Sequence, residues 1–239
     1  MNEIKIIYED DSLIVLDKQF GIPANNSETT KDEFTIQDYL EKKYSFFNSK
    51  NAKEEDPDFY KRNGIVHRID KETSGILVVA KSKEIFENLQ AQFKERKVSK
   101  TYVALVHGHV SPPEGDIVVP VGRLPWDRKK FGVLAGGKEA ETHYKVLKQY
   151  KRAFTLLELN PKTGRTHQIR VHLKYFNHPI FGDFLYAGRK TSRDDRKLLD
   201  RFFLHAQKIS FFYPNTSDKV EFESDLSPEL KKVLETIKN

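Results

Sequence analysis

The most constraining feature of the sequence is a short apolar run, residues 76–80, that directly follows a charged and polar stretch, residues 67–74. The run is largely β-branched and lacks alternation, so it predicts a strand that is buried on both faces. Gly75 permits a turn or a close backbone approach just before this strand. Asp70 is therefore expected on a loop at the mouth of a buried strand, beside Arg68. A carboxylate there is either half of a structural ion pair or a reactive group.

The composition limits the class of protein. The chain has 239 residues, which suits one large domain or two small ones, and 41 Lys and Arg against 35 Asp and Glu give a net charge of +6. This excess permits a nucleic-acid partner without requiring one. Because there is no cysteine, disulfides, thiolate catalysis and cysteine-ligated zinc are excluded. The N-terminus has no apolar signal core, and no window approaches the ~18 apolar residues of a membrane span, so we expect a cytoplasmic protein.

Two segments, residues 45–63 and 123–137, are predicted to form loops. The first is polar and charged and predicts a solvated surface loop. The second carries Arg123, Arg128 and the only tryptophan, Trp126. Such a segment either binds a phosphate backbone and stacks on a base, or is an ordinary loop with one anchoring ring.

Strands are expected near residues 4–8, 13–16, 76–80, 97–108, 116–121, 141–149, 153–159, 209–213 and 220–223, and helices near 34–44, 82–96, 166–176 and 228–237.

The second informative stretch is residues 163–176. A helix that starts near Thr166 would place His167, Arg170 and Lys174 on one face. It can be an ordinary amphipathic surface helix. However, cations at the positive end of a helix dipole are unfavourable, which suggests that an anion, a carboxylate or a phosphate, lies nearby.

Three segments together resemble one known family. Residues 67–75, His-Arg-Ile-Asp-Lys-Glu-Thr-Ser-Gly, resemble the active-site signature of the RluA-type pseudouridine synthases, with Ile69 in place of the usual leucine. Residues 100–106, Lys-Thr-Tyr-Val-Ala-Leu-Val, and residues 165–172, Arg-Thr-His-Gln-Ile-Arg-Val-His, resemble the second and third motifs of the family. The resemblance extends over roughly residues 13–213. Residues 17–23 match a further turn of the family only loosely, because Gln19 and Phe20 replace part of it.

The resemblance implies an RNA-modifying isomerase that detaches uracil from its ribose, turns it and rejoins it through carbon 5. Asp70 matches the catalytic aspartate, and Arg170 matches the arginine that pairs with it and holds it ionised. Tyr102 would stack on the uracil and could help to remove the carbon-5 proton. Whether Asp70 attacks the ribose or the base stays open. Arg68 matches a residue that fills the gap left by the flipped nucleotide.

The expected partner is ribosomal or transfer RNA, and both stay open. The candidate RNA-binding residues are Arg68, Lys100, Arg165, His167 and Lys174. The family reaction needs no cofactor, and neither a metal nor a membrane is expected to take part. We expect a monomer.

The resemblance also implies the fold: an α+β protein with a mixed, largely antiparallel β-sheet flanked by helices and a central RNA-binding cleft. Residues 1–239 are expected to form a single catalytic domain, with no separate N-terminal RNA-binding domain. The main alternative is a non-catalytic RNA-binding or RNA-folding protein on the same scaffold. An aspartate in an RNA groove repels phosphate, which argues against that alternative. A glycoside hydrolase that uses Asp70 and Glu72 is a third, weaker interpretation.

Overall fold

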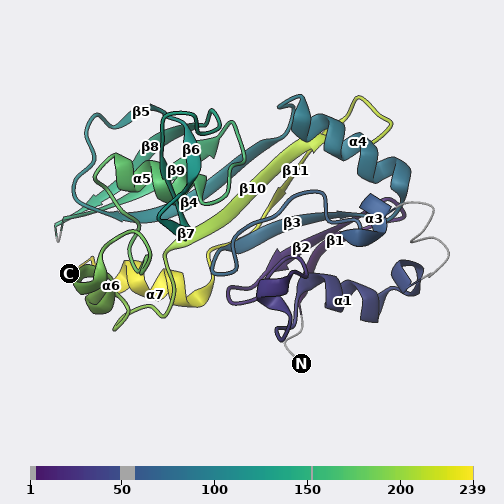
Figure 1. The fold of residues 1–239 in the computed structure, drawn as a ribbon, viewed down its shortest axis with the longest axis horizontal. Coiled ribbons are helices and arrows are strands. Elements are labelled where there is room, and N and C mark those ends of the chain that lie inside the picture. Colours follow the sequence, from purple (N-terminus) through teal and green to yellow (C-terminus); the bar gives the residue numbers. More distant parts are fainter. Residues whose placement is uncertain (1–3, 49–56, 152, 239) are drawn as a thin grey trace. The chain divides into compact units, whose positions relative to one another are not determined.

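A computed structural model describes residues 4–48, 57–151 and 153–238 of the chain (Figure 1). The chain divides into two compact units. Unit 1 comprises residues 1–98 and 208–224, and unit 2 comprises residues 99–207 and 225–239. The division falls within one strand, β10 (Leu204–Phe212), so each unit receives part of it.

Unit 1 is built on the buried strand predicted from residues 76–80. This strand, β3 (Ser74–Ala80), is buried at every position and pairs antiparallel with β2 (Leu13–Lys18), which pairs in turn with β1 (Lys5–Glu9). The part of β10 in this unit pairs antiparallel with β11 (Lys219–Glu223). The helices of unit 1 are α1 (Ile36–Lys43), α3 (Pro57–Lys61) and α4 (Lys83–Lys94), with 3-10 turns at Glu28–Thr30 and Ser45–Asn48.

The prediction that residues 45–63 form a solvated loop is wrong for the described part of that segment. Phe47 is fully buried and Phe59 is 3% exposed, and their rings are 5.9 Å apart in the core of unit 1. The aromatic residues of this segment lie on two short helical pieces that are too brief to show an apolar period. Residues 49–56 of the predicted loop lie outside the described residues.

Unit 2 contains an antiparallel sheet in the order β4 (Ser99–His107), β9 (Phe154–Pro161), β8 (Glu141–Tyr150) and β5 (Glu114–Val118). Helix α5 (Gln168–Tyr175) ends beside β8, where the ring of Phe176, the residue directly after the helix, lies 5.1 Å from that of Tyr144. Helix α6 (Arg189–Asp195) follows, and α7 (Pro228–Thr236) buries Leu230 and Val233.

The prediction that residues 123–137 form a loop is wrong for residues 123–133, whereas residues 134–137 do form a turn. Strands β6 (Val121–Leu124) and β7 (Asp127–Val133) pair antiparallel as a separate two-stranded sheet. Leu124 pairs with Asp127, so Pro125 and Trp126 form a tight turn between the strands. The charged start of β7 hides its strand character, because the usual alternation of apolar and polar residues is missing there.

The predicted α+β class with a largely antiparallel sheet is confirmed. Every strand pair described above is antiparallel, and helices accompany the strands in both units. Across residues 4–48, 57–151 and 153–238, no helix has both the length and the apolar character needed to cross a lipid bilayer.

Candidate active site

Asp70 lies in a turn of unit 1 that leads into β3, and we call residues 67–73 the Asp70 turn. The segment before it is attached to β3, because Ile65 bridges to Val79 and the Val66 N–H donates to the Val78 carbonyl at 3.4 Å. The turn itself is closed by the Thr73 N–H, which donates to the Asp70 carbonyl at 3.0 Å. The carboxylate of Asp70 is thus held at the mouth of the buried strand, as the sequence predicted, and its residue is half-buried.

His67 and Arg68 have different environments within this turn. Nε2 of His67 accepts a hydrogen bond from the Val78 N–H at 3.1 Å, and its ring stacks on Phe93 at 5.1 Å. A ring nitrogen that accepts carries no proton, so His67 is neutral and fixes the turn against β3. Arg68 is exposed to solvent, where it can contact RNA.

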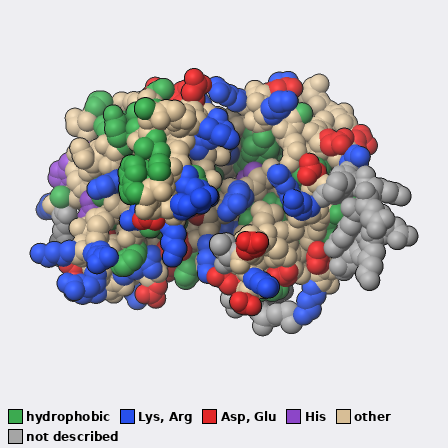
Figure 2. Space-filling view, in the orientation of Figure 1, with side chains coloured by type: hydrophobic (Ala, Val, Ile, Leu, Met, Phe, Trp, Pro, Cys, Tyr) green, Lys and Arg blue, Asp and Glu red, His purple; other side chains and the backbone are tan. Residues whose placement is uncertain are grey.

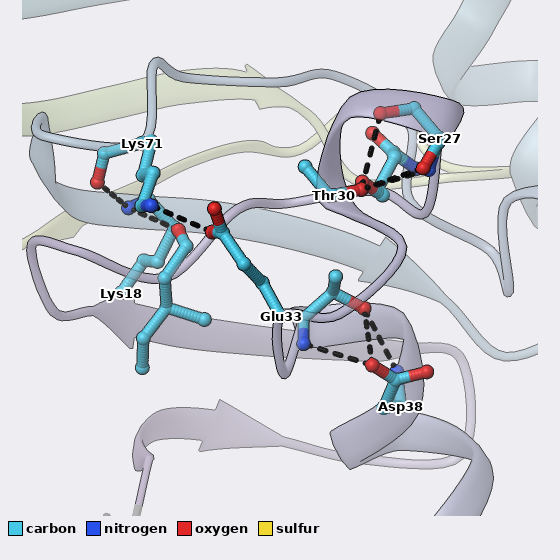
Figure 3. A network of polar contacts seen from close by, with 9 residues as sticks. Lys18, Ser27, Thr30, Glu33, Asp38 and Lys71 are labelled. Carbon is cyan, nitrogen blue, oxygen red and sulfur yellow. Dashed lines mark hydrogen bonds and ion pairs between the residues drawn. The ribbon is translucent and has the colours of Figure 1, made fainter.

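Lys18 supports the Asp70 turn from inside the protein, and sequence reasoning missed it (Figure 3). Its side chain is fully buried, and Nζ donates to the carbonyls of Gln19 and Ile22, both at 2.9 Å, and to that of Lys71 at 3.1 Å. The same Lys71 carbonyl accepts from the Gly21 N–H at 2.8 Å. Lys18 therefore holds the segment after β2 against the residue that follows Asp70. The loose family match at residues 17–23 was the available signal for this role.

Arg170 lies in unit 2, on the first turn of α5, and is 7% exposed. Its Nε donates to Oδ2 of Asp183 at 2.7 Å and one terminal nitrogen donates to Oδ1 at 3.0 Å, which is a two-pronged ion pair. The guanidinium carbon lies 4.9 Å from the ring centre of Tyr186 and 4.4 Å from that of Phe202. The guanidinium is therefore fixed in one orientation by charge and by ring contacts.

Asp183 is a site residue whose role sequence reasoning missed. It is fully buried, and its Oδ1 also accepts from the Leu185 and Tyr186 N–H groups at 3.0 and 3.2 Å. Two N–H groups of Arg170 donate to the carboxylate of Asp183. The other N–H donors of a guanidinium point in different directions, so they do not compete for the same carboxylate. The predicted pair between Arg170 and Asp70 joins residues of different units and stays a prediction.

Tyr102 and Lys100 lie two residues apart near the start of β4, so their side chains share one face of the strand. Tyr102 pairs with Leu159 of β9, and both Tyr102 and Lys100 are half-buried. Burial lowers the pKa of Lys100 to about 8. An ammonium group with so low a pKa is poorly solvated.

Residues 163–167, which we call the Gly164 turn, connect β9 to α5 and are organised by Gln168. Oε1 of Gln168 accepts from the Thr163 hydroxyl at 2.7 Å and from the Arg165 N–H at 3.0 Å. Its Nε2 donates to the Glu141 carbonyl at 2.9 Å and to the Thr142 hydroxyl at 3.0 Å. One buried amide therefore ties the turn to β8 through four hydrogen bonds.

His167 connects the Gly164 turn to the β6–β7 hairpin. It has a left-handed backbone with φ 56°, and Nδ1 lies 2.9 Å from the hydroxyl of Tyr186. That hydroxyl also accepts from the Phe131 N–H of β7 at 3.0 Å. At the other end of the hairpin, Trp126 is 75% exposed. Trp126 is therefore not an anchoring ring, and of the two interpretations drawn from the sequence, base stacking fits its exposure.

The predicted basic face of α5 is only partly correct. Arg170 is buried against Asp183, whereas Lys174, one turn further along, is exposed. Arg165 is half-buried, and its Nε donates to the Glu139 carbonyl at 3.0 Å. Figure 2 shows Lys and Arg side chains spread over the visible face of unit 2 rather than confined to one helix. Positive charge on this unit is thus a property of several elements.

Residues 12–175 match the model of the RNA pseudouridylate synthase family. An uncharacterized RNA pseudouridine synthase of Bacillus subtilis is 43% identical over 177 residues, which are 74% of this chain and 56% of that protein. A second uncharacterized RNA pseudouridine synthase, from Aquifex aeolicus, is 39% identical over 96% of this chain and 72% of that protein. The ribosomal large subunit pseudouridine synthase D of Nitrosomonas europaea is 36% identical and covers 99% and 66%.

Among solved structures, human RNA pseudouridylate synthase domain containing 1 matches with a TM-score of 0.71 and 27% identity, over 95% of this chain and 86% of that one. Human RNA pseudouridylate synthase domain containing 4 also matches with a TM-score of 0.71, at 25% identity, over 97% and 92%. The chain spans between 56% and 72% of the length of the three bacterial relatives named above.

Proposed function

Because the chain belongs to the RNA pseudouridine synthase family, we propose that it converts uridine to pseudouridine at one or more positions of a structured RNA. The family and the isomerase class predicted from the sequence are confirmed by the family model and by relatives at 35–43% identity. The observation that carries the proposal is that the family match includes Asp70, Tyr102 and Arg170 in one continuous segment, residues 12–175. In this proposal both units form one catalytic domain that acts as a cytoplasmic monomer.

Ribosomal RNA of the large subunit is the substrate class to test first. Relatives from Nitrosomonas europaea and Vibrio parahaemolyticus, both 36% identical, are named ribosomal large subunit pseudouridine synthases D and C. Transfer RNA is the second class.

The proposed reaction is an isomerisation with no net redox change. The bond between uracil N1 and ribose C1′ breaks, a bond between uracil C5 and C1′ forms, the C5 proton leaves, and N1 gains a proton. Asp70 supplies the carboxylate that attacks either the ribose or the base. Tyr102 stacks on the uracil and assists removal of the C5 proton. The chemistry requires that Asp70 be ionised.

Arg170 is the group proposed to keep Asp70 ionised. The guanidinium of Arg170 is fixed by its ion pair with Asp183 and by its ring contacts. If the carboxylate of Asp70 binds to this guanidinium, it is held by a rigid partner. Arginine suits this role better than lysine, because its planar donors can serve two carboxylates along different edges. The support for this role is the fixed guanidinium and the family match.

The RNA would be held by positively charged side chains and by one aromatic ring. Arg68 and Trp126 are both exposed, as this role requires. Arg68, on the Asp70 turn, would occupy the space left by the flipped nucleotide. Trp126 would stack on an unpaired base of a loop. The proposed phosphate contacts are Lys100, Arg165, His167 and Lys174. A non-catalytic RNA-binding protein would need these cations but would gain nothing from the half-buried carboxylate of Asp70.

The test is a pseudouridine map of total RNA in the native host and in a strain that lacks the gene, complemented with the wild type or with Asp70→Asn. Positions that vanish on deletion should return with the wild type and stay absent with Asp70→Asn, because the amide cannot act as the nucleophile. Asp58→Asn on α3, an exposed position, is the matched control and should restore every position. Restoration by Asp70→Asn would refute the catalytic role of Asp70.

A further inference from the structure

Among the phosphate contacts proposed above, Lys100 has the most unusual environment, because burial lowers its pKa. A Cβ atom placed on Gly164 would meet only one heavy atom within 4 Å, Nζ of Lys100 at 3.9 Å. The ammonium group therefore reaches the edge of an open space above the backbone of the Gly164 turn. Gly164 is exposed, so this space is accessible from solvent.

Within the described part of the chain, no hydrogen bond or ion pair involves Nζ of Lys100. Its pKa falls to about 8 through desolvation alone, so no neighbouring carboxylate compensates for the loss of water. A poorly solvated cation without a partner is costly, and the cost is recovered when an anion binds.

The groups around Lys100 in unit 2 make this site attractive to an anion. Tyr102 shares its strand face, and β9 contributes Leu159 and the neighbouring Pro161, which carry no charge. The Gly164 turn adds Arg165 and His167, and α5 begins directly after it, so its N-terminal N–H groups add positive potential. The other charged groups on the adjoining segments are Lys162, Glu139, Glu141 and Glu158. Strand β10, the other neighbour of β4, carries His205 and Lys208. None of these carboxylates forms an ion pair with Lys100 in the described residues.

We propose that Lys100, Arg165 and the exposed backbone of Gly164 form a binding site for one phosphate group of the RNA backbone. The site rests on the proposed function, which supplies RNA as the ligand. The turn needs no rearrangement for binding, because Gln168 already holds its backbone and the Glu139 carbonyl already orients Arg165. The absence of a side chain at position 164 lets a phosphate approach the ammonium group closely.

This site makes RNA binding depend on pH. Only the charged form of Lys100 attracts phosphate, and in the free protein that form is lost as the pH rises through about 8. RNA binding above this pH must therefore be accompanied by proton uptake. An arginine at the same position would stay charged throughout, because its pKa lies above about 12.

The experiment measures the affinity for a uridine-containing stem-loop RNA by fluorescence anisotropy at pH 7 and pH 9 and at several salt concentrations. Lys100→Met should weaken binding at pH 7 roughly tenfold and lower the slope of log affinity against log salt by about 0.7–0.9. The affinity of the wild type should fall about fivefold between pH 7 and pH 9 as Lys100 loses its charge, whereas that of Lys100→Arg should not. Lys162→Met, an exposed lysine beside the same turn, is the charge-matched control and should differ little from the wild type.

Thermal unfolding should show that Lys100→Met is as stable as the wild type, because a poorly solvated charge has been removed. Equal affinity and equal salt slope for Lys100→Met and the wild type would overturn the phosphate site, and so would a parallel loss of binding by Lys100→Arg and the wild type at pH 9. Pseudouridine formation is assayed separately on the wild type. Lys100-dependent RNA binding without product formation would refute the proposed function and leave the site standing.

Discussion

The Asp70 turn lies close to a fully buried lysine and the Gly164 turn lies close to a half-buried one, and the two lysines have opposite environments. Nζ of Lys18 donates to three backbone carbonyls, one of them within the Asp70 turn. Nζ of Lys100 reaches the Gly164 turn without a hydrogen bond to it, and a neutral amide, Gln168, holds that turn instead. The comparison separates two uses of a poorly solvated charge. The lysine that donates to carbonyls supports the turn of the proposed catalytic residue, whereas the lysine without a partner is available to a ligand.

The largest effect is expected from Lys18→Met. Methionine keeps the apolar stem but leaves carbonyls of residues 19 and 22 without their donor, so the free energy of unfolding should fall by about 2–4 kcal/mol. Urea denaturation followed by circular dichroism measures this change, and turnover should fall with it because the Asp70 turn loses its support.

Lys31→Met, at an exposed position of unit 1, is the control for Lys18→Met and should change stability little. If Lys18→Met were as stable and as active as the wild type, Lys18 would have no positioning role, and the contrast with Lys100 would disappear.

An intermediate effect is expected from Gln168→Leu. Leucine fills a similar volume but makes none of the four hydrogen bonds, so we expect a loss of about 1–3 kcal/mol of stability and a more mobile Gly164 turn. Hydrogen exchange at the Arg165 N–H, which donates to Oε1 of Gln168, reports that mobility directly. Gln90→Leu on α4 is the control. Unchanged protection at Arg165 would show that the amide does not hold the turn.

The smallest effect is expected from Glu33→Gln, which breaks the ion pair between Glu33 and Lys71 on the surface of the Asp70 turn (Figure 3). The atoms are 2.6 Å apart, but the two side chains are 38% and 49% exposed. Exposed pairs contribute about 0.2–1 kcal/mol, so the change in unfolding free energy should be below about 1 kcal/mol and should vanish at high salt. If Glu33→Gln lowered the free energy of unfolding as much as Lys18→Met, the surface ion pair and not Lys18 would be the main support of the turn.

Local sequence patterns predicted most of the strands and helices but not the contacts that complete the site. The apolar run at residues 76–80 is strong enough to define β3, and the spacing of Ile85 and Leu89 defines α4. Asp183 and Lys18 could not be assigned roles in this way. Asp183 meets Arg170 across 13 positions and Lys18 meets Lys71 across 53, and such pairs depend on how the chain folds back. The β6–β7 hairpin was missed because charged residues occupy its strands.

The β6–β7 hairpin has a further consequence for how proteins of this kind can diverge. Its strands pair only with each other within the described sheets, so mutations at its tip leave the larger sheet of unit 2 intact. Its base is different, because the Phe131 N–H donates to the hydroxyl of Tyr186, whose ring lies against Arg170. We therefore expect substitutions near Trp126 to be tolerated by the fold, and substitutions near Phe131 to be unfavourable because they disturb the arginine proposed to be catalytic. The hairpin thus combines an evolvable end with a constrained one.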